Sequence, residues 1–269
     1  FQLYLRFSNK LRSRLLMIIA FTIDVIILRA LMFIFRIPGN LYDAYIFSPG
    51  SFAASDLIPS MGDFLFNALA LLVIAYALFI TYPNIRLKKH RSAFGRYFLI
   101  FSLFLHIFIF YRIFLWAASS LILDASYSLN LNRIFFLSTE SFIALLIFTL
   151  LLFSFFLVTY RILGLAFQYS RRSAGVYFII LTITTTIYAL YCILVHDCDY
   201  LLFIPLLVYA AAFFVLTYGS EEISRVLFSA SVLYLLLFSV ISTAVISKNN
   251  HIRENEERKL LAIELSSGD

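Results

Sequence analysis

The sequence predicts an all-α fold, a polytopic bundle of transmembrane helices, and three observations lead to this prediction. Hydrophobic residues fill 62% of the 269 positions, and only 13% are charged, whereas a soluble domain carries roughly 25% charged residues. The mean hydropathy is +0.94. The charges also gather between long apolar stretches instead of alternating with apolar residues. We therefore expect the lipid bilayer to be the main partner of the chain.

Each predicted helix is an apolar stretch long enough to cross a bilayer, which takes about 20 residues. The stretch FLIFSLFLHIFIFYRIFLW, at 98–116, is apolar on every side. A membrane β-barrel would instead show segments of about ten residues with alternating polarity. We count about seven helical spans. They cover residues 15–35, 64–82, 97–118, 139–160, 175–195, 200–218 and 226–246.

Lysine and arginine concentrate on one side of these spans. If the N-terminus is cytoplasmic, the inner segments hold 13 Lys and Arg residues, and the outer inter-span loops hold two, Arg36 and Arg133. Cytoplasmic loops of membrane proteins carry such an excess of cations. The basic net charge of +6 therefore reflects membrane topology, and we expect no nucleic-acid partner. An odd number of spans then places the C-terminal tail outside.

The composition changes sharply at the end of the seventh span. We expect residues 1–246 to form the transmembrane module and 247–269 to begin an external, charged helical segment. Glu254 and Arg258 stand at i,i+4 in this tail, a spacing that stabilises a helix. The alternative is a frayed terminal helix. Because the sequence starts with Phe1 and the tail stops in mid-pattern, we expect a fragment of a longer protein.

The longest outer loop, at 36–63, contains the cation-poor stretch SPGSFAASDLIPSMGD. Ser60 and Asp63 stand there in the Ser-x-x-Asp spacing of a helix capping box, with Asp in place of the usual Glu. Pro59 keeps the second span from extending outward, and Gly62 lies between the capping residues. The sequence thus predicts an outer cap at Pro59, Ser60, Gly62 and Asp63. Beyond capping the helix, this loop could also form a surface near a ligand.

Four ionisable side chains fall inside predicted spans, where each is costly. Asp24 and His106 lie at similar depth near mid-membrane, and Arg29 and Arg112 share the outer third. We expect Asp24 to contact His106 and each arginine to reach an outer acid or the interface. The three candidate acids are Asp63, Asp124 and Glu140. The Asp24–His106 pair has three possible roles: a proton relay, polar packing between helices, or the lining of a water-filled crevice.

Other candidates for chemistry are weaker. The stretch LTITTTIY, at 181–188, could line a pathway, but threonines in helices usually bond to their own helix carbonyls. His196, Asp197, Cys198 and Asp199 are adjacent in sequence, and adjacent ligands rarely converge on one metal. The two cysteines imply no disulfide framework. No nucleotide-binding or hydrolase motif occurs, so we expect no catalytic residue, metal or cofactor in this chain.

Two stretches carry a resemblance to a known family. FSPGSFAASDLIPSMGDFLFNALALLVIAYALF, at 47–79, resembles the segment that enters the second span of large multi-span bacterial sensor histidine kinases. Their pattern is an F-S-P start, then small residues with Ser, then P-S-L-G-D before a Leu-rich helix. The tail ENEERKLLAIELSSGD resembles the start of their external sensor segment. In the stretch 47–79 the matching positions are Phe47, Ser48, Pro49, Ala53, Ala54, Ser55, Pro59, Ser60, Gly62 and Asp63, with Met61 in the Leu position.

The resemblance implies a membrane-embedded sensory input module of a two-component system, in the bacterial inner membrane. It also implies that the homodimeric parent protein is an ATP-dependent protein-histidine kinase whose catalytic domains lie beyond Asp269. The alternative that the residues leave open is a secondary transporter or channel. Such a protein needs a continuous polar route, for which Asp24, His106 and the Thr182–Thr186 cluster are the candidates. A membrane enzyme or a structural role is the third possibility.

Overall fold

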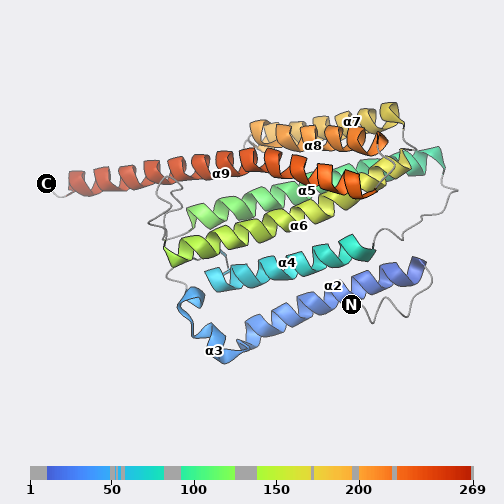
Figure 1. The fold of residues 1–269 in the computed structure, drawn as a ribbon. Helices are drawn as coiled ribbons and strands as arrows, with labels where there is room; N and C mark the ends of the chain where they lie inside the picture. The colour runs from blue at the N-terminus through green and yellow to red at the C-terminus, as the bar shows by residue number, and fades with distance from the viewer. Residues whose placement is uncertain are drawn as a thin grey trace. The chain divides into compact units, whose positions relative to one another are not determined.

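A computed structural model of the chain describes residues 11–48, 52, 54–55, 58–81, 92–124, 138–170, 173–195, 200–219 and 223–267. The all-α prediction is confirmed. Long helices follow one another along the chain (Figure 1), and within the described ranges the one β-type pairing is an isolated antiparallel bridge between Ser55 and Ile58.

Each predicted span coincides with one helix of the structure. Six of these helices are long and apolar enough to cross a membrane, as expected of a multi-pass membrane protein. The exception is α8, whose apolar part with described side chains, Phe203–Tyr218, is shorter. The helices are α2 (Leu11–Phe35), α4 (Met61–Thr81), α5 (Ala93–Leu123), α6 (Thr139–Tyr169), α7 (Ala174–Val195), α8 (Tyr200–Tyr218) and α9 (Ile223–Ser267).

Several helices are longer than the apolar stretches that predicted them. Helices α5 and α6 have 31 residues each and α9 has 45, against about 20 for a minimal span. The predicted boundary at 246/247 falls inside α9, which continues unbroken into the charged tail. Two short elements, α3 (Gly39–Tyr42) and the 3-10 helix η1 (Tyr45–Phe47), lie in the connection between α2 and α4.

A backbone turn with its own hydrogen bond ends α2. Arg36 has a φ of 48°, in the left-handed region, and the N–H of Ile37 donates to the carbonyl of Met32 at 3.2 Å. This bond is the one that closes a Schellman motif, in which the first residue after the helix is left-handed. The chain therefore leaves α2 in a sharp turn.

Contacts divide the chain into two compact units, and the boundary cuts across the long helices. Unit 1 comprises residues 1–21, 74–113 and 153–241. Its core is aromatic: Tyr111, Phe155 and Phe238 are fully buried and contact one another ring to ring. Tyr177 of α7 also donates from its hydroxyl to the carbonyl of Ala210 of α8 at 3.0 Å. Such pairs join helices without needing a hydrophobic driving force.

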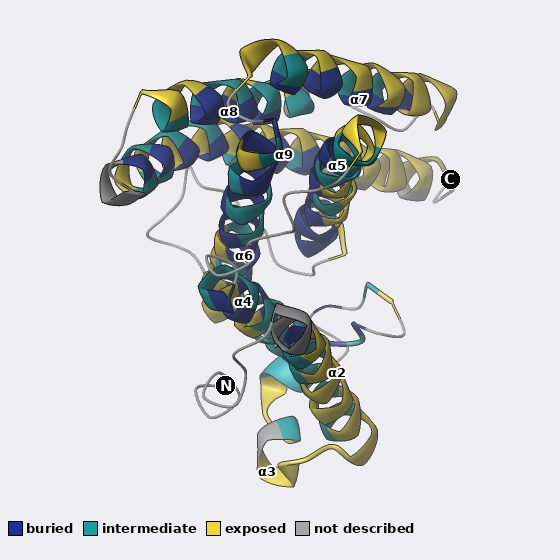
Figure 2. Cartoon of the chain, turned by 90° about the vertical axis from the view of Figure 1, so that its right-hand side faces the viewer, coloured by how far each residue is buried: buried dark blue, intermediate teal, exposed yellow. Residues whose placement is uncertain are grey.

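Unit 2 comprises residues 22–73, 114–152 and 242–269. Phe114 of α5 and Phe148 of α6 contact each other with ring centroids 5.9 Å apart. Asn249 of α9 is buried and donates from Nδ2 to Oγ of Ser119 of α5 at 3.0 Å. Figure 2 shows that α2 is exposed along most of its length, whereas α6 carries many buried residues.

Candidate functional site

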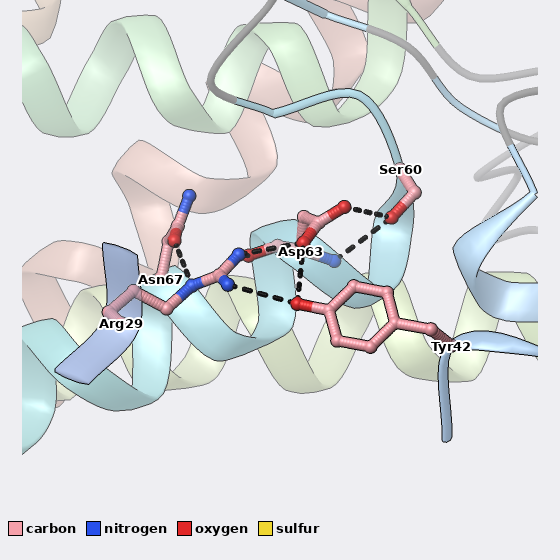
Figure 3. Close-up of polar contacts among 5 residues, drawn as sticks. All are labelled: Arg29, Tyr42, Ser60, Asp63 and Asn67. Atoms are coloured by element: carbon pink, nitrogen blue, oxygen red, sulfur yellow. Dashed lines mark hydrogen bonds and ion pairs between the residues drawn. The ribbon is translucent and has the colours of Figure 1, made fainter. Parts of the chain in front are cut away.

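A group of polar residues in unit 2 meets where α2, the connection after it and the start of α4 come together. Five side chains form this cluster, which we call the Arg29 cluster (Figure 3): Arg29, Tyr42, Ser60, Asp63 and Asn67. Arg29 lies near the end of α2, and Asp63 lies in the first turn of α4. Tyr42 is the last residue of α3. The cluster thus joins two predicted spans to the loop between them.

An ion pair forms the centre of the cluster. Nη2 of Arg29 lies 2.8 Å from Oδ1 of Asp63, and the two side chains are 13% and 5% exposed. The same nitrogen donates to the main-chain carbonyl of Asp63 at 3.2 Å. The prediction that Arg29 reaches one of the three candidate acids is therefore confirmed for Asp63, whereas the side of the membrane stays a prediction. Since the carboxylate lies in the first turn of α4, the helix dipole stabilises it as well.

The remaining donors of Arg29 also find partners. Nε donates to Oδ1 of Asn67 at 2.7 Å, and Nη1 donates to the hydroxyl of Tyr42 at 3.2 Å. The rings of Phe33 and Phe66 each lie 5.6 Å from the guanidinium carbon, a distance at which a cation is attracted to an aromatic face. A guanidinium that bonds through all three of its nitrogens is fixed in orientation.

Ser60 caps α4 as its spacing with Asp63 predicts. The N–H of Asp63 donates to Oγ of Ser60 at 3.1 Å, and this hydroxyl donates to Oδ2 of Asp63 at 2.7 Å. The capping-box prediction is confirmed in its first half. In a full box the acidic side chain would reach back to the N–H of the capping residue. Here the carboxylate of Asp63 accepts from Ser60, Arg29 and Tyr42.

Aromatic rings hold the loop against this cap. Phe47 lies 4.5 Å from the ring of Tyr42 and 5.5 Å from that of Phe66, measured between centroids. A Cβ placed on Gly62 would come within 2.5 Å of the Phe47 ring. The absence of a side chain at Gly62 is what allows Phe47 to pack there. Pro59 is partly exposed at the entry to α4.

The remaining predicted residues do not join this cluster. Asp24 of α2 is exposed. His106 of α5 is also exposed, and its Nδ1 lies 2.6 Å from the carbonyl of Ser102 in the same helix. Asp24 belongs to unit 2 and His106 to unit 1, so their contact stays a prediction. Arg112 of α5 belongs to unit 1, and its approach to an acid or to the interface stays a prediction.

The structure also answers two of the weaker sequence hypotheses. Each described threonine of the α7 cluster donates to a carbonyl four residues back in its own helix, at 2.8–2.9 Å, as expected for threonines in a helix. Cys192 is disulfide-bonded, which the spacing of the two cysteines did not predict. Cys198, the other cysteine of the sequence, lies outside the described residues together with His196, Asp197 and Asp199.

Sequence reasoning did not find two members of the cluster. Asn67 stands four residues after Asp63, on the same face of α4, and this spacing could have revealed it. Nothing in the sequence around Tyr42 indicates its role. Among the described residues no group of His, Cys, Asp and Glu is arranged to hold a metal ion. Within the cluster the Ser60 hydroxyl and the Arg29 guanidinium both bind the carboxylate of Asp63, so the arrangement provides a fixed ion pair.

No protein-family model, characterised protein or solved structure matches this chain.

Proposed function

We propose that the chain is the membrane-embedded sensory input module of a signal-transducing protein. The observation that supports this best is the Arg29 cluster, in which one buried ion pair holds the loop after α2 against both α2 and α4. Such a pair has two discrete states, formed and broken, and switching elements need two states. A stimulus that binds the loop, or that competes for Arg29 or Asp63, would shift the balance between them.

On this proposal α9 is the output element, and its part from Ser242 onward belongs to the same unit as the cluster. Helix α9 has 45 residues, about 68 Å at 1.5 Å per residue, which is more than twice the hydrocarbon thickness of about 30 Å. Its last part is charged and is mostly exposed from His251 onward. A helix of this length can carry a movement from the membrane to a following domain. Asn249 is bound to Ser119 of α5 where the charged part begins.

We propose further that the N-terminus is cytoplasmic and that the tail after Ile246 is external. The 13-to-2 distribution of loop cations supports this orientation. The disulfide of Cys192 supports it independently. Disulfides persist in oxidising compartments, and Cys192 lies near the end of α7 that the charge distribution places outside. Labelling of an introduced cysteine near Ser55, but not of one near Lys89, from the outer face would support it, whereas labelling at Lys89 alone would contradict it.

The parent protein, on this proposal, is a sensor histidine kinase of the bacterial inner membrane. Its phosphoacceptor and ATP-binding domains would follow Asp269. Determining the gene sequence downstream of this position tests the proposal. A His-Glu phosphoacceptor helix and an Asn- and Gly-rich domain would support it, whereas further apolar spans without a soluble domain would contradict it.

Two observations weigh against the alternative of a transporter or channel. The threonine hydroxyls of α7 donate to carbonyls of their own helix. Water along α7 would have to compete with these bonds. Asp24 and His106 are exposed on their helices, whereas a polar route needs them inside the bundle. A transport function would show itself as solute or ion flux in liposomes that contain the chain.

Hydrogen exchange tests the sensory proposal directly. The chain is placed in liposomes, and exchange of the tail peptides 250–267 is compared between wild type and Asp63→Asn. We expect exchange in the tail to change severalfold because the broken cluster alters the unit to which the tail belongs. Glu140→Gln, at a partly exposed acid in the first turn of α6, is the matched control and should leave the tail unchanged. An unchanged tail in Asp63→Asn, with faster exchange at the start of α4, would contradict the proposal.

A further inference from the structure

An exposed carboxyl group interrupts the apolar surface of α2. Asp24 is exposed, and it lies within a 20-residue stretch, Leu16–Phe35, that is apolar enough to cross a membrane. Its neighbours one turn away, Ala20, Ile27 and Leu28, are exposed too. Lipid covers exposed apolar side chains without cost, but a polar group at this depth is expensive. The exposed face around Asp24 therefore needs a polar partner.

Helix α5 presents the complementary group. His106 is exposed and stands in a stripe with Phe98, Ile109, Ile113 and Trp116, which are 50–62% exposed. The spacing of three, four or eight residues keeps these side chains on one face of the helix. His106 is the ionisable member of this stripe. His106 on α5 is therefore costly to expose to lipid, as Asp24 on α2 is.

The hydrogen bond of His106 decides which kind of partner it needs. Its Nδ1 lies 2.6 Å from the carbonyl oxygen of Ser102. A carbonyl oxygen only accepts, so Nδ1 carries the proton. The ring then offers Nε2 outward, as an acceptor when the ring is neutral and as a donor when it is charged. A carboxyl group matches both forms, because it donates O–H when neutral and accepts as a carboxylate when ionised.

The two groups also lie at matching positions along their helices. Asp24 is thirteen residues after Leu11, the first residue of α2, and His106 is thirteen residues after Ala93, the first residue of α5. This is about 20 Å along each helix. The first and third spans of an alternating bundle run in the same direction. Asp24 and His106 therefore come to similar depth in one membrane.

We propose that Asp24 of one copy of the chain binds His106 of a second copy, so that the exposed faces of α2 and α5 form an interface between copies. Asp24 and His106 are each exposed on their own helix, so both are accessible to a second copy. A second copy supplies the missing group at the correct depth without any other protein. Hydrogen bonds between polar side chains are an established way for transmembrane helices to associate. The interface is independent of the sensory role proposed above.

Mixed crosslinking in membranes tests the interface. Two differently tagged chains are co-expressed, one with Ile27→Cys on α2 and the other with Ile109→Cys on α5, and a short bismaleimide links nearby thiols. We expect a crosslinked species that carries both tags. Replacing Ile109→Cys by Ile187→Cys, on the exposed face of α7, should give none. A chain that bears both cysteines, expressed alone, shows whether a link forms within one copy, because such a link gives a crosslinked monomer and not a dimer.

Variants of Asp24 show whether the polar pair causes the contact. Asp24→Leu should lower the mixed crosslink roughly three- to eighteenfold, the range for one hydrogen bond between transmembrane helices. Asp24→Asn should retain it, because the amide still donates to Nε2. Three results would overturn the proposal. They are no mixed crosslink, a link that forms only within one chain, and a mixed link that Asp24→Leu leaves unchanged.

Discussion

Arg29 and Asp63 neutralise each other across 2.8 Å with their side chains 13% and 5% exposed, although 34 residues separate them in the chain. Two buried charges gain from such a pair only when the geometry is good and their other donors and acceptors are satisfied. Both conditions hold here, because Tyr42, Ser60 and Asn67 take up the remaining bonds. The pair therefore specifies one arrangement of the loop and the two helices.

Removing one partner of this pair should be strongly destabilising. We expect Asp63→Asn to lower the free energy of unfolding by about 3–5 kcal/mol, since it leaves the Arg29 charge without a counter-charge. In a chain of this size that is a fall of roughly 10 °C in Tm. Thermal unfolding in detergent micelles measures it.

An exposed ion pair of the same chain provides the control. Arg258 and Glu254 of α9 lie 3.9 Å apart with side chains 74% and 56% exposed. Arg258→Gln should cost no more than about 1 kcal/mol. Equal losses for the buried and the exposed pair would show that the Arg29 cluster is not the stabilising element described here.

Gly62 should tolerate no side chain while Phe47 keeps its place. We expect Gly62→Ala to destabilise the protein by about 1–3 kcal/mol, because the added methyl group would lie 2.5–2.7 Å from ring carbons of Phe47. Adding Phe47→Leu should restore part of this loss. Gly164→Ala in α6, where nothing lies within 4 Å of the new Cβ, should be neutral or slightly stabilising. Thermal unfolding of the three variants separates a local clash from a general intolerance of alanine.

The end of α2 offers a test of backbone strain. Arg36 has a φ of 48°, a conformation that costs a non-glycine residue roughly 1–2 kcal/mol. Arg36→Gly removes this cost but loses about 0.5–1 kcal/mol through the greater freedom of the unfolded chain. We expect a net gain of about 0.5 kcal/mol for glycine and a loss for Arg36→Val. If the valine variant were as stable as the glycine variant, the left-handed turn would not form in the membrane.

The features that the sequence could predict are those that lipid makes costly. An arginine in an apolar span must reach an acid or the interface, so Arg29 pointed to a short set of partners that included Asp63. The Ser60 cap followed from spacing alone, because the free N–H groups at a helix start need acceptors. Helix positions followed from the length of apolar runs for the same reason.

Other features depend on tertiary contacts that leave no local pattern. Tyr42 joins the Arg29 cluster through the path of a loop, and the choice of Asp63 over Asp124 or Glu140 depends on which helices are neighbours. Asp124 instead accepts from Ser120 at 2.7 Å. Helix α9 extends past its apolar stretch because charged residues also form helix once the preceding turns are in place. The exposure of Asp24 and His106 likewise depends on how the helices pack.

Asn249 should fix α9 against α5 where the charged tail begins. It is 4% exposed, and its Nδ2 donates both to Oγ of Ser119 at 3.0 Å and to the carbonyl of Val245 at 2.9 Å. Asn249→Leu removes the bond between helices. A single such bond in a membrane bundle contributes about 0.6 kcal/mol and at most about 1.7 kcal/mol, so we expect a small loss of global stability. The local effect should be larger, because Asn249 precedes the exposed part of α9.

Hydrogen exchange distinguishes this local effect from global destabilisation. In Asn249→Leu we expect amides around residues 245–255 to exchange several times faster, with the aromatic core around Phe238 unchanged. Ser119→Ala, which removes the same bond from the α5 side, should reproduce the change. Asn250→Leu, one residue along and only partly buried, is the matched control and should have a smaller effect. If Asn249→Leu and Asn250→Leu exchange alike, the bond to Ser119 does not fix α9, and the tail would have to be coupled to the membrane module by other contacts.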